Sequence, residues 1–202
     1  MQKTVTIGTA AMLSFALAAC GSADRNESSA SDANAVTSNE VGSVDNNMTA
    51  ATNDTAMTMA PTTAPEFAAA AAASDLFEIQ SSKMAQTQAQ SPDVKTFAAM
   101  LVQDHTKSTA ELKSIASKEN ITLSPPTLAP DMQSKIDALK SAKGAAFDTL
   151  YLTQQVPAHE TALKLHQGYS QSGDNASLKA FASKTSTVVS KHLDEARAMS
   201  KQ

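Results

Sequence analysis

Residues 94–116 read VKTFAAMLVQDHTKSTAELKSIA and carry the clearest helical pattern in the chain. Apolar residues recur there every three or four positions, as they do on one face of an α-helix. That face contains Val94, Phe97, Ala98, Leu101, Val102, Leu112, Ile115 and Ala116. His105 follows Leu101 by one helical turn and therefore belongs to the same face. The sequence thus predicts a long amphipathic helix that turns a histidine towards a protein core.

Start and stop signals place this helix at about residues 92–119. Ser91-Pro92-Asp93 supplies a cap residue, a proline in the first turn and an acid at the positive end of the helix dipole. Further helical patterns cover residues 66–90, 131–140, 145–171 and 176–200. No segment alternates with the period of a strand. We therefore expect an all-α fold: an antiparallel four-helix bundle with a short extra helix between the second and third long helices.

The composition agrees with helices that pack closely. Hydrophobic residues make up 42% of the 202 residues, aromatics only 4%, and tryptophan is absent. A net charge of -4 gives no electrostatic reason to expect nucleic-acid binding. The single cysteine excludes an internal disulfide.

The N-terminus has the pattern of a bacterial export signal. Lys3 precedes an apolar run that is shorter than the roughly 20 residues of a spanning helix, so we interpret residues 1–19 as a signal peptide. The run ends in Leu17-Ala18-Ala19-Cys20, which resembles a lipobox, in which the cysteine is lipidated. The alternative is an ordinary cleavage site that happens to precede a cysteine. Since Gly21 is not an aspartate, we expect an outer-membrane lipoprotein that is anchored through Cys20 and faces the periplasm.

Residues 20–65 are rich in Ser, Thr, Asn, Asp and Ala and show no hydrophobic period. This composition predicts a disordered tether, leaving residues 66–202 as the bundle domain. Met48, Met57 and Met59 could bind Cu(I), but we interpret them as incidental residues of a low-complexity segment. Acidic and basic residues are equal in number from residue 66 onward, so the net negative charge belongs to the tether.

Each long helix places one metal-competent group on or near its inward face. These groups are Glu78, His105, His159 and His192. Burying an imidazole costs free energy unless it is paired, and side chains that converge from facing helices are how bundle metal sites are built. The set predicts a site for one transition-metal ion, Zn²⁺, Cu²⁺ or Fe²⁺. The alternative is that the histidines are core residues with ordinary hydrogen bonds.

We expect the turns at residues 90–92 and at Gly173 to lie at the same end of an up-down bundle, so that the four groups can meet near mid-height. Asp104 is a candidate partner for a ligand or a solvated charge, while Glu160 and His166 are interpreted as surface residues. Pro157 predicts a kink close to His159. The Glu-x-x-His spacing of di-iron oxidases is missing at the core histidines, which argues against a ferroxidase.

The domain is similar to the bacterial family called domain of unknown function 4142. The resemblance rests on residues 94–105 with their Asp-His ending, on residues 147–152 leading to His159-Glu160, and on the segment around His192. It implies a ferritin-like four-helix fold, and the family's recurring Glu and His positions fall on the four groups named above. Related periplasmic ferritin-like families have been linked to copper handling, which is an analogy. In place of the family's acid, Pro157-Ala158 precede His159, so we expect a displaced ligand there.

Three functions follow from this reading. The first is a membrane-anchored envelope lipoprotein that binds a transition metal for sequestration, sensing or stress tolerance. The second is a structural or interaction module with an envelope protein as partner and no metal. The third is a metal-assisted hydrolase or oxidase with Glu78 as base. Because no nucleophile, phosphate loop or substrate can be recognised, we assign no catalytic residue and favour a role other than catalysis.

Overall fold

The computed structural model describes residues 61–201, and their regular structure is entirely helical. The helices are α1 (Ala64–Gln88), α2 (Pro92–Lys118), α3 (Pro130–Ser141), α4 (Gly144–Ser172) and α5 (Ala176–Met199). The all-α prediction is confirmed, and each predicted helix is present to within about two residues at either end. The predicted signal peptide, Cys20 and the three tether methionines lie outside the described residues.

The helices begin where local chemistry satisfies their free N–H groups. The Ser91 side chain accepts a hydrogen bond from the Val94 backbone N–H, and Asn175 does the same for Leu178 at the start of α5. Gly144, with a φ of 58°, makes the left-handed turn that redirects the chain from α3 into α4.

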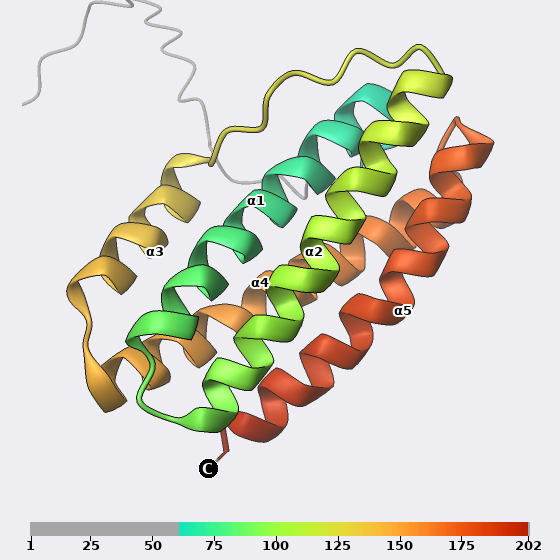
Figure 1. The fold of residues 1–202 in the computed structure, drawn as a ribbon. Coiled ribbons are helices and arrows are strands. Elements are labelled where there is room, and N and C mark those ends of the chain that lie inside the picture. The colour runs from blue at the N-terminus through green and yellow to red at the C-terminus, as the bar shows by residue number, and fades with distance from the viewer. Residues whose placement is uncertain (1–60, 202) are drawn as a thin grey trace, which may run out of the picture. The chain divides into compact units, whose positions relative to one another are not determined.

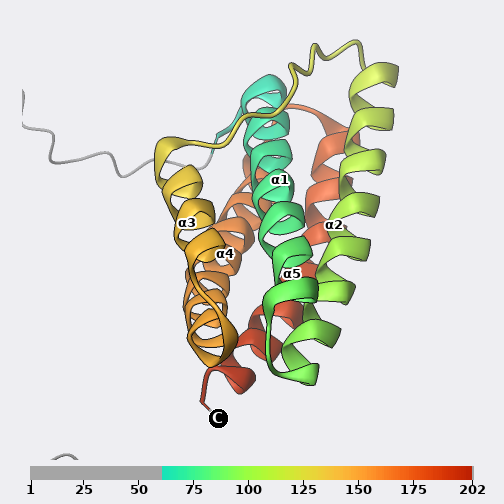
Figure 2. The ribbon, with the colours of Figure 1, turned by 60° about the vertical axis from the view of Figure 1, so that its left-hand side comes forward.

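The four long helices form one bundle. α1 packs against α2 and α4, and α5 packs against the same two helices, so each long helix has two neighbours in the bundle (Figure 1). Neighbours run antiparallel, which confirms the predicted architecture. α3 lies outside the bundle against α1 and α4 (Figure 2).

One expectation about the topology is wrong: the two tight turns lie at opposite ends of the bundle (Figure 1). The α1–α2 turn lies beside the start of α4, where Asp148 accepts hydrogen bonds from the backbone N–H groups of Gln90 and Ser91. The α4–α5 turn lies beside the start of α1, where Asp174 donates its N–H to the Thr62 carbonyl. The segment between α2 and α4 causes this: its loop and α3 carry the chain back along the bundle, so α2 and α4 are parallel.

Two apolar clusters fill the ends of the bundle and leave a polar layer between them. One cluster surrounds Phe97, Phe147 and Tyr151, and the other surrounds Phe67, Tyr169 and Phe181. The buried polar residues gather between them: Asp75, Glu78, Ser81, Ser82, His105, Gln154, Gln155, His159, His166 and His192. A core that keeps so many polar groups needs a reason, since each costs free energy unless it is paired.

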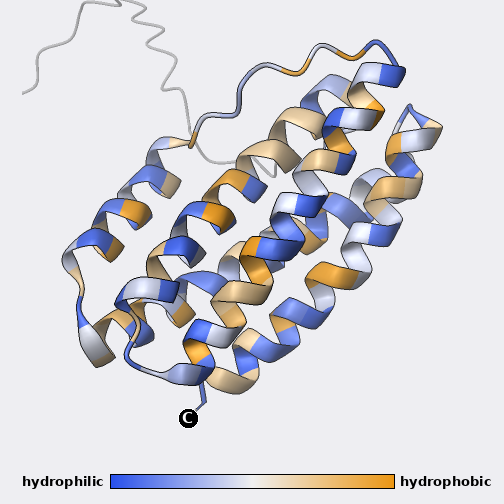
Figure 3. Cartoon of the chain, in the orientation of Figure 1, coloured by the Kyte–Doolittle hydropathy of each residue, from blue (hydrophilic) through white to orange (hydrophobic). Residues whose placement is uncertain are grey.

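Polar and apolar residues alternate in short patches along every helix (Figure 3). Accordingly, none of the helices between residues 61 and 201 is long and apolar enough to cross a membrane.

Candidate metal centre

Three histidines from three helices meet in the polar layer. His105 of α2, His159 of α4 and His192 of α5 are 4%, 1% and 2% exposed. Their ring centroids lie 5.8, 5.6 and 5.6 Å apart, which makes a nearly equilateral triangle. One ring nitrogen of each lies within 4.8 Å of the others. This His105–His159–His192 cluster is the triad discussed below.

Each triad ring is held from outside through one nitrogen. Asp75 of α1 contacts His105 Nδ1 at 2.8 Å, the Gln155 backbone carbonyl contacts His159 Nδ1 at 2.9 Å, and Asp104 contacts His192 Nε2 at 3.0 Å. All three partners are acceptors, so each contacted nitrogen carries the proton.

The second nitrogen of each ring has no partner. His105 Nε2, His159 Nε2 and His192 Nδ1 are buried and make no hydrogen bond. A neutral imidazole that donates through one nitrogen presents a lone pair on the other, and metal-binding histidines are oriented in this way. The triad can therefore offer three neutral nitrogen ligands from a nearly closed site, which suits a borderline transition-metal ion.

The electrostatics of the three rings differ. Burial lowers the pKa of His159 and of His192 to about 4, so both rings are neutral at pH 7. Burial also acts against a charged His105, but its hydrogen bond to Asp75 and the nearby Glu78 outweigh burial and raise the pKa of His105 above 6.5. Of the three rings, His105 is therefore the one that holds a second proton near neutral pH when no ion is bound.

Glu78, the fourth predicted ligand, lies beside the triad rather than within it. Its Oε1 is 3.9 Å from His159 Nδ1, the nitrogen that already donates to Gln155. Its Oε2 is buried without a partner, and burial raises the pKa of Glu78 to about 7. The structure thus brings three of the four predicted groups together and puts the fourth against the back of His159.

His159 is not displaced by the proline that precedes it. α4 continues through Pro157, whose side chain is exposed. The carbonyl that loses its helical hydrogen bond to this proline belongs to Thr153, which is also on the exposed side. Because the broken bond faces solvent, the inward side of α4 keeps its register and His159 reaches the triad.

A family model described as "Domain of unknown function (DUF4142)" matches residues 47–199. The chain belongs to this family. The DUF4142 match begins ahead of α1, within the segment interpreted as a tether.

Two solved structures of the protein CopM have a similar fold. Its silver-bound form has a TM-score of 0.57 at 18% identity and covers 67% of this chain and 93% of CopM. Its Cu(II)-bound form has a TM-score of 0.59 at 16% identity and covers 69% and 96%. At this identity, the likeness concerns the fold of the DUF4142 domain. A comparison with curated proteins gave no match.

Sequence reasoning missed Asp75, which holds His105 and also accepts a hydrogen bond from Thr109. On α1, both Ser74 and Asp75 continue the inward stripe from Ala71 to Glu78 at helical spacing, and the smaller Ser74 fits a tightly packed stripe better. The structure buries Asp75 to 4% exposure and leaves Ser74 half-buried. The pairing of Asp75 with a histidine 30 positions away has no local signal.

His166, interpreted as a surface residue, is buried at 3% exposure. It packs edge-on against Phe67 and Phe181, and its Nδ1 has no partner. Glu160 is half-buried and forms an ion pair with Arg197, so it remains a surface group. Asp104 does belong to the polar layer, but its partner is His192 rather than its neighbour His105.

Replacing His166 with leucine should stabilise the domain. The substitution removes a buried polar atom without a partner, worth about 1 kcal/mol at pH 7. Burial lowers the pKa of His166 to about 4, so the native ring resists protonation that the unfolded chain accepts below 6.5. The gain should therefore grow by about 2 kcal/mol at pH 5. Urea unfolding of both proteins at the two pH values measures this, and an equal gain at both would contradict the buried, neutral ring.

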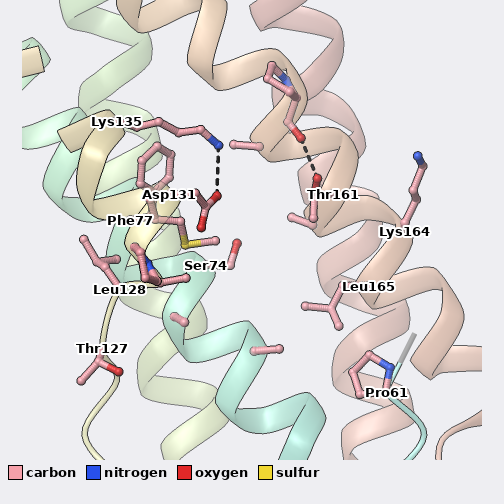
Figure 4. A pocket seen from close by; sticks show the side chains of 18 residues that line it. Pro61, Ser74, Phe77, Thr127, Leu128, Asp131, Lys135, Thr161, Lys164 and Leu165 are labelled. Carbon is pink, nitrogen blue, oxygen red and sulfur yellow. Dashed lines mark hydrogen bonds and ion pairs between the residues drawn. The ribbon is translucent and has the colours of Figure 1, made fainter. Parts of the chain in front are cut away.

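A groove of about 850 Å³ opens on the outer side of α1 and α4, under the loop that leads into α3 (Figure 4). Phe77, Leu128 and Leu165 line it, and Lys135 forms an ion pair with Asp131 at its edge. It contains none of the triad histidines. A second groove, of about 290 Å³, does not contain them either. The triad is thus sealed from both.

Proposed function

We propose that the bundle binds one transition-metal ion through His105 Nε2, His159 Nε2 and His192 Nδ1. The observation that carries this proposal is that three rings on three helices bring one nitrogen each within 4.8 Å of the others, and that each ring has one nitrogen held by an acceptor and the other buried without a partner. Leaving three acceptors unpaired in one core is expensive, and one shared cation satisfies all three.

Copper, zinc and iron are the ions that the ligand set favours. The fold similarity to CopM, whose structures hold Ag and Cu(II), supports an ion of this class. Three protein ligands leave a fourth position, and Glu78, which contacts His159 on its Nδ1 side, is outside the cluster. Because neither groove contains the triad, sequestration of the ion fits the structure better than turnover of an organic substrate.

Equilibrium dialysis against Zn²⁺, Cu²⁺ and Fe²⁺, followed by elemental mass spectrometry, tests this proposal. The chain from residue 21 onward, purified without a histidine tag, should hold one ion per chain for at least one of the three metals. A domain that is fully helical and remains free of metal after all three challenges would overturn the proposal and favour a structural role for the histidines.

We further propose that the domain works in the cell envelope, tethered through lipid on Cys20. The support is the sequence pattern of the first 20 residues alone. Replacing Cys20 with serine should move the protein from the membrane fraction to the soluble fraction, as measured by immunoblotting after carbonate extraction. An unchanged distribution between the two fractions would contradict the proposed lipid anchor.

A further inference from the structure

Two carboxylates, Asp75 and Asp104, contact the triad from behind, and among residues 61–201 each forms an ion pair only with a triad ring. Asp75 is 2.8 Å from His105, with both side chains about 5% exposed. Asp104 is 3.0 Å from His192 and is 35% exposed. No lysine or arginine of residues 61–201 forms an ion pair with either carboxylate; their ion-pair partners are the two histidines. The third ring is held by the neutral carbonyl of Gln155.

When the triad binds an ion, the charge of that ion has to balance the negative charges of these two carboxylates. Coordination requires all three rings to be neutral ligands, so the protein then contributes two negative charges from Asp75 and Asp104. Glu78 is not counted with them, because its Oε1 is 3.9 Å from His159 Nδ1, a nitrogen that already donates to Gln155. Uncompensated charge in or beside a core is costly. A doubly charged ion balances both carboxylate charges, whereas a singly charged ion leaves one of them unbalanced.

We propose that Asp75 and Asp104 make the triad selective for divalent over monovalent cations. This inference rests on the proposed function and specifies the charge of its ion. The two aspartates act through charge as well as through ring orientation. Since the Coulomb energy between a carboxylate and an ion is proportional to the charge of the ion, removing one carboxylate costs a divalent ion twice the free energy that it costs a monovalent one.

The Asp104→Asn variant of the full chain tests this proposal. Asparagine keeps a side-chain oxygen that can accept from His192 Nε2, so the ring stays oriented while the charge is lost. Affinities for Zn²⁺ and for Ag⁺, in chloride-free buffer, are measured by competition with a chromogenic chelator. The expected fold-loss for Zn²⁺ is the square of that for Ag⁺: a loss of about fivefold for Ag⁺ goes with about 25-fold for Zn²⁺.

Asp75→Asn should show the same relation, because the ratio depends on the charge of the ion and not on the position of the carboxylate. Asp194→Asn, which removes an exposed carboxylate from α5, is the matched control and should leave both affinities within about twofold. Equal fold-losses for the two ions would show that the aspartates only orient the rings. Unchanged affinities would show that the aspartates neither orient the rings nor act through their charge. Either result overturns the proposal. A wild-type chain that binds neither ion would instead overturn the proposed function itself.

Discussion

Replacing His105 with alanine should abolish stoichiometric metal binding. The substitution removes one of three converging nitrogens and also leaves Asp75 buried without its partner. Loss of a group that merely supports a ligand typically costs 10- to 100-fold in metal affinity, so loss of the ligand itself should cost about 100-fold or more. Isothermal titration with Zn²⁺ measures the change.

His166→Leu is the matched control for this experiment. His166 is as deeply buried as His105 and lies on the same helix as His159, but it is outside the triad. The account predicts that His166→Leu binds the ion within about threefold of wild type, whereas His105→Ala does not. If neither variant changes metal affinity, the triad is an ordinary set of core histidines.

The second large effect is the dependence of metal affinity on pH. The raised pKa of His105 means that its second proton is present below pH 6.5 and must leave before Nε2 can bind an ion. His159 and His192 stay neutral down to about pH 4. Between pH 6 and pH 5 a metal ion therefore competes with one proton, so its Kd should rise about tenfold for each unit by which the pH falls. Below about pH 4 the slope should steepen as the other two rings take up protons.

Zn²⁺ affinity of the wild-type chain, measured at half-unit intervals, checks this dependence. The wild-type chain is used because Glu78 is one of the causes that raise the pKa of His105, and the slope is read below pH 6, where Glu78, with a pKa of about 7, is already mostly protonated. Three unperturbed histidines would instead give a slope that rises from about 1.5 at pH 6.5 to nearly three at about pH 5.5. That result would contradict the environments described for His159 and His192.

The fold could be predicted almost completely, because local chemistry determines its parts. Ser91-Pro92 does begin a helix, and the face that includes His105 is buried as its spacing requires. The direction of α4 could not be predicted in this way. It depends on where α3 and the loop before it carry the chain, which is a matter of tertiary packing. The triad nevertheless forms, since His105 and His159 lie near the middle of their helices and reach mid-height from either end.

The ligand set could be predicted only in part. Histidines on inward faces are visible as a pattern, and these three do converge. Of the partners that orient them, only Asp104 is visible as a candidate in the sequence. Asp75 competes with Ser74 for one place on a stripe, and the acceptor for His159 is a backbone carbonyl, which any residue provides. Glu78 shares the inward face of α1, but a carboxylate one turn away from Asp75 meets the back of a ring rather than its free nitrogen.

The most direct test of the central claim is a crystal structure of the chain grown with Zn²⁺, with data collected on both sides of the zinc absorption edge. The account predicts one strong anomalous peak in the core, about 2.0–2.1 Å from His105 Nε2, His159 Nε2 and His192 Nδ1. A core without a peak, with zinc bound only to surface carboxylates such as Asp194 and Glu195, would contradict it.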